Sequence, residues 1–372
     1  MYIVLTGAKK NVGDFLIRDR SLKLLKHLKP NDEFIEFNSW ESLADKLETV
    51  NKSKGIIICG GPGYKQDMFP KVYPLTDNLD DIKVPMYILG AGWYGVTGEN
   101  EVLKNYTFTD KTFSLLQKIA QNNGLSCRDY YTKRVVNNNG INSINMTGCP
   151  VMYNIDYLNT EMRIPNEINS IVFTTPQDPV FANQCIKLMK SLKQKFPNAK
   201  LYASFHRGVG RDSGTGLVEG IHLEKMAKEA AVLGYEIVDA SYDLSKISFY
   251  SETDLHVGYR VHAHLYYLSE RKPSFLINED GRGTGFCSLL GLEGINAYKN
   301  NGVGKYSTKL QSRVMKKLYN KTIGLNIAKN DISDEVINLM NEEISNGFTR
   351  FTGTDKLIDK YFNGMKKFID NI

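Results

Sequence analysis

Strand-sized apolar runs alternate with segments of helical periodicity along most of this chain, and this alternation limits the fold more than any other feature. A strand followed by a helix and then by another strand is typical of parallel sheets with crossover helices. The sequence therefore predicts an α/β protein with Rossmann-like, doubly wound sheets. The expected strands occupy residues 2–6, 34–37, 55–59, 86–90, 125–127, 143–146, 170–174, 200–204, 236–238, 254–257 and 274–277.

The segments between these strands carry apolar residues at helical spacing. The clearest pattern covers residues 14–28, where Phe15, Leu16, Leu22 and Leu25 contribute to the apolar positions. Such spacing indicates amphipathic helices with one face on a sheet. The other helices of the body are expected at 110–122, 180–195, 221–233, 244–250 and 260–270.

The last part of the chain has a different pattern. Beyond residue 305 strand signals disappear, and two helices are expected, at 333–345 after a Ser333 cap and at 355–370 after a Thr354 cap. The apolar stripe of the last helix favours packing against the body of the protein. Contact with a membrane surface is the alternative.

The length of 372 residues favours two domains. A stretch with little periodicity, from Gly148 to Pro165, separates the two series of strands and is the expected boundary. The predicted parts are an N-terminal Rossmann-like domain at 1–165, a C-terminal one at 166–305 and a helical tail at 306–372. Two such domains facing each other, as in the GT-B arrangement, place the carboxyl ends of their strands around a shared cleft.

Composition excludes several classes of protein. A 42% hydrophobic share with 24% charged residues indicates an ordered globular protein, and a net charge of +6 without a basic block argues against nucleic acid as a partner. No apolar run reaches the roughly 20 residues that cross a bilayer. The chain opens on a strand, so a cytoplasmic location is expected. Its five scattered cysteines favour buried, reduced thiols over a disulfide or a metal site.

Glycine-rich loops follow the first strands. Gly7–Asp14 lies between a strand and a helix, where free amide hydrogens bind anions. Asn11 and Asp14 are its candidate functional residues, and the alternative is a plain turn capped by Asp14. Gly60–Gly63 follows the most hydrophobic strand, with Gly61 and Tyr64 as candidates for contact with a sugar.

Two further strand ends of the first half carry candidates. Trp93 follows Gly90-Ala91-Gly92 and is either a stacking platform for a sugar ring or a packing residue. Arg128 follows the short strand at 125–127 and either points into the cleft or forms part of a surface pair with Asp129.

The second half carries stronger signals. His206 and Arg207 directly follow a strand, and Arg260 and His262 follow another strand at the expected start of a helix. Arg282 lies in a glycine-rich turn after the next strand. Guanidinium groups match carboxylates and phosphates, and a helix N-terminus favours anions. Three strand-end loops therefore converge on one cleft with groups that bind anions, and a loop without a function is the alternative for each.

Half of the six histidines lie between His256 and His264, but a metal site is not expected there. His262 and His264 are two residues apart, so on a helix they point in different directions. The spacing of a zinc helix and its acidic partner are both missing. A structural role is the alternative for His264.

Taken in order, these pieces resemble the polysaccharide pyruvyl transferase family. The resemblance covers about residues 5–290 and ends at the strand after Pro273. It includes a Gly-x-Arg-x-His segment at Gly258–His262. The other matching segments are Asn11-Val12-Gly13-Asp14, Gly60-Gly61-Pro62-Gly63, Gly90-Ala91-Gly92, Cys127-Arg128-Asp129 and Gly148-Cys149-Pro150.

This resemblance implies a GT-B-like fold and a transferase. The reaction it implies moves a carboxyethylidene group from phosphoenolpyruvate to a sugar of a bacterial surface polysaccharide, such as a capsule or exopolysaccharide, or of its lipid-linked precursor. Phosphoenolpyruvate is then a co-substrate, and no separate cofactor is expected. Contact with the inner face of the cytoplasmic membrane is possible for such an acceptor.

The resemblance also implies roles for particular residues. Arg260 and His262 carry over to the donor site, with Arg207 as a second arginine and His206 beside it. The mechanistic hypothesis makes protonated His262 the proton donor and Asp14 the base that activates a sugar hydroxyl. Asn11, Gly61, Tyr64, Trp93 and Arg128 are assigned to the acceptor side.

One loop departs from the family pattern. Family members often have a Tyr-Asp-x-Lys-like segment where this chain has Asn278 to Arg282, so Arg282 stands as a replacement for the lysine. The runner-up function is a GT-B glycosyltransferase with a nucleotide-sugar donor, in which Glu279 grips the ribose. A non-catalytic, two-lobed binding protein is a third reading, which the lack of a signal peptide disfavours.

Overall fold

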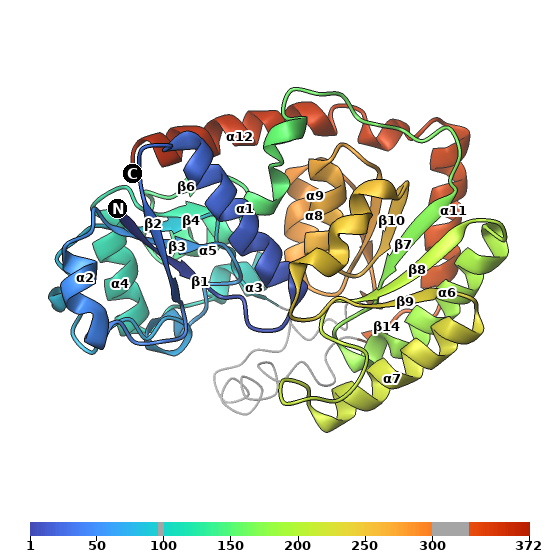
Figure 1. Cartoon of the computed structure of the whole chain (residues 1–372), viewed down its shortest axis with the longest axis horizontal. Helices are drawn as coiled ribbons and strands as arrows, with labels where there is room; N and C mark the ends of the chain where they lie inside the picture. Colours follow the sequence, from blue (N-terminus) through green and yellow to red (C-terminus); the bar gives the residue numbers. More distant parts are fainter. Residues whose placement is uncertain (96–99, 300–326) are drawn as a thin grey trace.

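The computed structural model describes residues 1–95, 100–299 and 327–372 and contains two parallel sheets (Figure 1). The first sheet has the order β2-β1-β3-β4, and all its neighbours are parallel. A parallel bridge from Ala91 to Cys127 extends it toward the small β5-β6 pair. The bounds are β1 Tyr2–Thr6, β2 Phe34–Asn38, β3 Ile56–Cys59, β4 Met86–Leu89, β5 Ser126–Cys127 and β6 Asn145–Met146.

The second sheet is larger, with the order β12-β11-β10-β7-β8-β9, and it is also entirely parallel. Its strands are β7 Ser170–Thr174, β8 Lys200–Phe205, β9 Glu236–Asp239, β10 Leu255–Gly258, β11 Ser274–Asn278 and β12 Ile295–Asn296. The fold class expected from the sequence is therefore confirmed, and most strands agree within one or two residues. The connection from β6 to β7 contains the expected boundary at residues 165–166, and the limits of the domains stay a prediction.

Helices connect the strands, as the alternation requires. The segment expected as a helix at 244–250 is a 3-10 helix, Leu244–Glu252. The α-helices are α1 Val12–Leu28, α2 Leu47–Asn51, α3 Asn100–Asn105, α4 Asp110–Ala120, α5 Tyr130–Asn138, α6 Ala182–Lys195, α7 Leu217–Val232, α8 Val261–Ser269, α9 Gly281–Leu289, α11 Ile332–Ser345 and α12 Thr354–Asp370.

Three of the expected helix caps are wrong. Asn11, not Asp14, caps α1, because its side-chain oxygen accepts the Gly13 amide. Helix α12 follows Gly353, whose φ of +82° is one that glycine adopts without strain, and Thr354 is its first residue. Helix α11 begins before Ser333, whose buried hydroxyl has no partner among the described residues.

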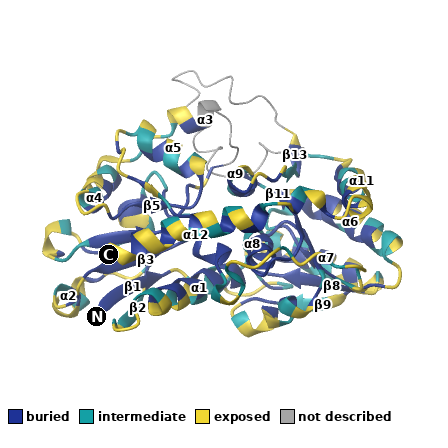
Figure 2. Cartoon of the chain, turned by 90° about the horizontal axis from the view of Figure 1, so that it is seen from above, coloured by how far each residue is buried: buried dark blue, intermediate teal, exposed yellow. Residues whose placement is uncertain are grey.

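The core consists of two groups of apolar side chains on opposite faces of the first sheet, because successive residues of a strand point to opposite sides. Val4 and Ile57 belong to the group that continues into the second sheet, whereas Ile3 and Ile58 pack on the other side. Figure 2 shows buried strands beneath helices with exposed outer faces. The two halves thus share a continuous hydrophobic core.

The C-terminal segment connects these halves. Helix α12 lies along both of them and contacts α1, β6 and α8 (Figure 1). Its apolar face is buried, as the packing interpretation predicted. The expectation of no strands beyond residue 305 is wrong for β14, Ile327–Ala328, which pairs antiparallel with β13, Tyr298–Lys299. The part of the predicted tail at 306–326 lies outside the described residues.

Two general features concern membranes and metals. Among the described residues, no helix has both the length and the apolar character to span a membrane. The same part of the chain contains no group of three His, Cys, Asp or Glu side chains arranged to hold a metal ion. The five cysteines are free and buried, as expected.

Candidate active site

The candidate site begins where strand order reverses in the second sheet. β7 and β10 are neighbours, and the connections after them leave in opposite directions along the sheet. A crevice opens at such a point in parallel α/β sheets. Gly258 ends β10 with a φ of +148°, and a Cβ on it would lie 2.4 Å from the Thr174 carbonyl oxygen. Only glycine therefore lets the chain turn here and bring Arg260 to the N-terminus of α8.

A pocket of about 400 Å³, its open mouth included, lies at this crevice. It is lined by residues of both halves: Asn11, Arg128, Gln177, His206, Tyr259, Arg260, Val261, His262, Glu279 and Arg282. Eleven site residues were predicted from the sequence, and six of them line this pocket. A seventh, Asp14, lies in the first turn of α1, the helix that Asn11 caps.

Backbone contacts between the halves fix the walls of this pocket. The Val12 amide, at the start of α1, donates to the His206 carbonyl at 3.1 Å. The Gly281 amide donates to the Gly95 carbonyl at the same distance. A Cβ on Gly13 would lie 2.6 Å from the His262 ring nitrogen Nδ1, so the start of α1 lies directly against this imidazole.

Arg260 differs from the other two guanidiniums of the pocket in having no ion pair with a carboxylate among the described residues. Its Nη1 donates to Gln177 Oε1 at 3.4 Å and its Nη2 to the Pro176 carbonyl at 3.2 Å, whereas Nε is buried without a partner among the described residues. Burial lowers the pKa of Arg260 to about 10, so it stays charged at neutral pH. A buried charge with a free donor is suited to binding an anion.

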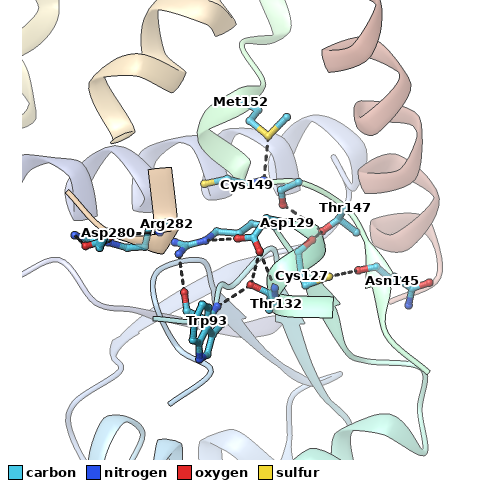
Figure 3. Close-up of polar contacts among 12 residues, drawn as sticks. Trp93, Cys127, Asp129, Thr132, Asn145, Thr147, Cys149, Met152, Asp280 and Arg282 are labelled. Atoms are coloured by element: carbon cyan, nitrogen blue, oxygen red, sulfur yellow. Dashed lines mark hydrogen bonds and ion pairs between the residues drawn. The ribbon is translucent and has the colours of Figure 1, made fainter. Parts of the chain in front are cut away.

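The two other guanidiniums of the pocket each have an acidic neighbour. Arg282 lies 2.7 Å from Asp280, and Arg128 lies 3.1 Å from Asp129 and donates to the Trp93 carbonyl at 3.0 Å. Figure 3 shows Arg282 beside Asp280, and Asp129 near Trp93. These neighbours hold both side chains in place, since a guanidinium forms directional pairs with carboxylates.

The position of Arg128 depends on a neighbouring glycine. A Cβ on Gly92 would lie 1.8 Å from Arg128 Nε, so the Gly-x-Gly loop leaves room for the guanidinium. Arg128 is buried, and the alternative of an exposed Arg128–Asp129 pair is therefore wrong.

His262 occupies the first turn of α8 and lines the pocket. Its Nε2 is buried and has no partner among the described residues. Burial, helped by the charges of Arg128, Arg282 and Arg260, lowers the pKa of His262 to about 3. The imidazole is therefore neutral at neutral pH, which differs from the hypothesis of a side chain that is already protonated.

Two carboxyl groups face the basic side chains. Burial raises the pKa of Glu279 to about 7 and that of Asp14 to about 6. Glu279 Oε1 accepts the amides of Gln177 and Asp178 at 2.7 and 3.0 Å, which holds this carboxyl at the pocket wall. The site thus contains two carboxyl groups whose protonation can change near neutral pH.

A buried hydrogen-bond chain supports the base of α8. The Arg260 amide donates to Thr174 Oγ1, which contacts His256 Nε2 at 2.8 Å. Ser274 Oγ lies 2.7 Å from Nδ1 of both His256 and His264. Because one hydroxyl has one hydrogen to donate, at least one of these rings carries a proton on Nδ1 and donates it to Ser274. His264 is therefore structural and lies outside the pocket.

A family model matches most of the chain. The model that describes polysaccharide pyruvyl transferases matches residues 11–281. The chain belongs to the polysaccharide pyruvyl transferase family. The matched segment begins at Asn11, the cap of α1, and contains every residue of the pocket wall except Arg282.

Solved structures resemble this family member only distantly. MnaA of S. aureus, solved with UDP, is 10% identical over 92% of this chain and 96% of its own, with a TM-score of 0.48. HepE of Anabaena, solved with UDP and glucose, is 12% identical over the whole of both chains, also at 0.48. These values carry no information about the ligand of this chain. No curated protein matches it.

Two acceptor-side predictions are wrong for this family member. Tyr64 is fully buried and its hydroxyl donates to the Ser126 carbonyl, so it faces the core. Trp93 is only 2% exposed and packs edge-on against Tyr106, so it offers no face to a sugar. Both follow strand ends, but the local sequence does not fix which way a side chain turns there.

Other predicted residues lie near the pocket without lining it. Arg207 pairs with Glu219 of α7 at 3.2 Å, although its charge acts on Asp14. Gly61, with a φ of +72° and open space around its Cβ position, does not line the pocket. His206 does line it, and its Nε2 lies 3.1 Å from the Tyr250 hydroxyl.

Three residues in or beside the site were not predicted for it from the sequence. Gln177 had no expected role, and Glu279 was expected only as a ribose ligand. Tyr94 was not a candidate either; it is 36% exposed, and its ring lies 5.1 Å from the Arg282 guanidinium. The available signal was position: Gln177 and Glu279 both closely follow strands of the second sheet.

Proposed function

We propose that this protein transfers a carboxyethylidene group from phosphoenolpyruvate to two hydroxyls of a sugar in a bacterial surface polysaccharide or its lipid-linked precursor. The observation that carries this proposal is the convergence of Arg128, Arg260 and Arg282 on one pocket. Family membership supports a transferase of this kind.

The charge of the donor suits this pocket. Phosphoenolpyruvate has a carboxylate and a phosphate on adjacent atoms, and each anion accepts paired hydrogen bonds from a guanidinium. The free Nε of Arg260 and the N-terminus of α8 lie at the same wall. Bound anions would satisfy this donor and offset the repulsion among the three cations.

The reaction balances without another co-reactant. A proton adds to C3 of the enol phosphate, C2 becomes an oxocarbenium-like centre, and the first hydroxyl oxygen bonds to C2. The C2–O bond to phosphate then breaks, and the second hydroxyl closes the ketal. The hydroxyls lose two protons, of which one replaces the proton delivered to C3 and the other leaves with inorganic phosphate.

His262 remains the proposed proton donor. The residue lines the pocket, its Nε2 has no partner among the described residues, and the negative charge of a bound donor would raise the low pKa of the imidazole. Asp14 is the proposed base, since its pKa of about 6 leaves it mostly ionised at neutral pH. Glu279 is proposed to hold a proton beside Arg260 while the anion is bound.

The acceptor is proposed to approach from the side of the first half, past Asn11 and Arg128. Tyr94 takes the stacking role that the sequence analysis gave to Trp93. Tyr94 is 36% exposed, and its ring lies between 5 and 6 Å from both the Lys65 ammonium and the guanidinium of Arg282, a residue of the pocket wall. Aromatic rings of this kind bind the apolar face of sugars.

The deciding experiment incubates the protein with phosphoenolpyruvate and candidate galactosyl or N-acetylmannosaminyl acceptors. Release of phosphate together with an acceptor that has gained a carboxyethylidene group is the expected result. Arg260→Ala should reduce release by about 100-fold or more, because one donor to developing charge is removed. Arg18→Ala, at an exposed ion pair with Glu36, is the control and should match the wild type.

A thermal-shift comparison distinguishes the runner-up function. Phosphoenolpyruvate should raise the melting temperature of the wild type and not that of Arg260→Ala. Stabilisation by UDP but not by phosphoenolpyruvate, with hydrolysis of a nucleotide sugar, would instead identify a glycosyltransferase.

A further inference from the structure

Helix α7 has an exposed apolar stripe outside the pocket. Leu217, Val218, Ile221 and Val232 are 60, 63, 49 and 85% exposed. At 3.6 residues per turn these positions fall on one side of the helix, where Lys225 and Lys228 lie between Ile221 and Val232. Single exposed apolar residues are ordinary, but a stripe of large ones along a surface helix indicates an interaction site.

The stripe is not the core face of α7. The opposite side of the helix is already buried, with Leu223, Met226 and Ala230 packed into the hydrophobic core. Helix α7 is therefore apolar on two sides, and only one of them has a partner among the described residues.

Lysines lie within and beside this stripe. Helix α6 packs beside α7 on the same side of the second sheet, and Lys225 of α7 donates to Asn183 of α6 at 3.1 Å (Figure 1). Helix α6 has no acidic residue. The lysines of the two helices are Lys187, Lys190, Lys193, Lys195, Lys225 and Lys228.

The acidic residues of α7 do not cancel this charge. Glu219 is paired with Arg207 at 3.2 Å, and Glu224 lies 3.9 Å from Arg211. Glu229 remains exposed. The outer surface of α6 and α7, here named the α6–α7 face, therefore combines exposed aliphatic side chains with Lys190, Lys225 and Lys228.

We propose that the α6–α7 face docks on an anionic lipid bilayer. Aliphatic side chains that enter the headgroup region and lysines that reach anionic headgroups are the two components of binding by an interfacial helix. The long lysine stems can lie along the apolar boundary while their charges stay in water. Binding to lipid does not rest on the proposed reaction.

A second copy of the chain fits this face less well. In a two-fold dimer the same patch contacts itself, which would bring the exposed Lys190, Lys225 and Lys228 of one face against those of the other. Like charges at such a distance repel, whereas an anionic bilayer neutralises them. Charge therefore favours the bilayer as the occupant.

The docked orientation has a consequence for the site. The Arg207–Glu219 ion pair ties the first turn of α7 to the loop that carries His206, a residue of the pocket wall. The pocket would then lie close to the lipid surface. If the proposed function holds, a lipid-linked acceptor reaches the site without leaving the membrane.

Co-sedimentation with vesicles tests the proposal on the full chain. The wild type should bind vesicles of equal parts phosphatidylcholine and phosphatidylglycerol, bind pure phosphatidylcholine poorly, and be released by salt. The triple variant Leu217→Asn, Val218→Asn, Ile221→Asn should bind about tenfold more weakly, and Lys190→Glu with Lys228→Glu should lose most binding. The matched control, Ile164→Asn with Ile344→Asn, changes exposed apolar residues elsewhere and should bind as the wild type does.

Three outcomes would overturn the proposal. They are failure of the wild type to bind anionic vesicles, full binding by the triple variant, and a wild-type dimer in sedimentation velocity that the triple variant loses. Phosphate release with a water-soluble acceptor should be unchanged in the triple variant. Loss of lipid binding is thereby distinguishable from failure of the proposed reaction.

Discussion

The charge state of His262 follows from its neighbours. A histidine in the unfolded chain has a pKa near 6.5, whereas burial lowers the pKa of His262 in the folded protein to about 3. Between these two pH values the unfolded chain binds a proton at this position and the folded protein does not. The titration of His262 therefore leaves the free energy of unfolding unchanged above about pH 7 and lowers it as pH falls toward the folded pKa. The same side chain is the proposed proton donor.

His262→Gln should therefore lessen the loss of stability on the acid side. Between about pH 7 and pH 5 the melting temperature of the wild type should fall more than that of the variant, because glutamine does not titrate. His206, His256 and His264 are unchanged in both proteins, so the difference between them isolates position 262. Equal pH dependence of the two melting curves would contradict the low pKa.

The proposed role of His262 as proton donor is tested by phosphate release. His262→Ala should abolish phosphate release, with an expected loss of about 100-fold or more, while phosphoenolpyruvate still stabilises the fold. Turnover that stays within about tenfold of the wild type would remove His262 from the role of proton donor.

Tyr94 provides a test of the acceptor side. Tyr94→Ala should raise the KM for the sugar by about tenfold, because one stacking contact with the sugar is lost. The KM for phosphoenolpyruvate should stay near that of the wild type. Tyr94→Phe keeps the ring and serves as the control. An unchanged KM for the sugar in Tyr94→Ala would place the acceptor elsewhere.

At the scale of elements, the turn from β10 to α8 determines where the anion-binding groups lie. The hydrogen-bond chain through Thr174 and His256 supports this turn from below. Much of it was predictable, since strand, glycine, arginine and histidine follow one another in the sequence. The close approach of Gly258 to Thr174 was not, because these residues are far apart in the chain.

Gly258→Ala should be more harmful than an alanine at another glycine with positive φ. Gly234 has a φ of +80° and open space around its Cβ position. Gly234→Ala should therefore lower the free energy of unfolding by about 1–2 kcal/mol, through backbone strain without a clash. Gly258→Ala adds a clash with the Thr174 backbone and should lower stability further and abolish stabilisation by phosphoenolpyruvate. Guanidinium unfolding of both variants gives the comparison, and equal costs would argue against the tight turn.

At the scale of the whole molecule, α12 and the shared hydrophobic core connect the two halves. Tyr2, on the first strand, donates to the carbonyl of Ile372 at 3.0 Å, and Arg271 of the second half pairs with Asp359 of α12. Met365 is fully buried in the core group that extends through both sheets. Unfolding of the two halves should therefore be coupled.

Met365→Ala is expected to destabilise the whole protein by about 2–5 kcal/mol, as for other buried methionines. Lys366→Ala, at an exposed neighbour, should change stability by less than about 0.5 kcal/mol. Both are measured by denaturant unfolding followed by tryptophan fluorescence and circular dichroism. A transition confined to one half, seen as curves that do not coincide, would contradict the coupling.

The sequence by itself determined the α/β class, the strands from β1 to β11, and the placement of Arg260 and His262 at a helix start, because these depend on local periodicity and on one glycine. Only the tertiary structure decided which strand-end side chains face the pocket. Tyr64 and Trp93 turned to the core, whereas Arg128 reached the pocket wall. The low pKa of His262 also required the fold, because burial and the charges of distant arginines are properties of packed neighbours and not of adjacent residues.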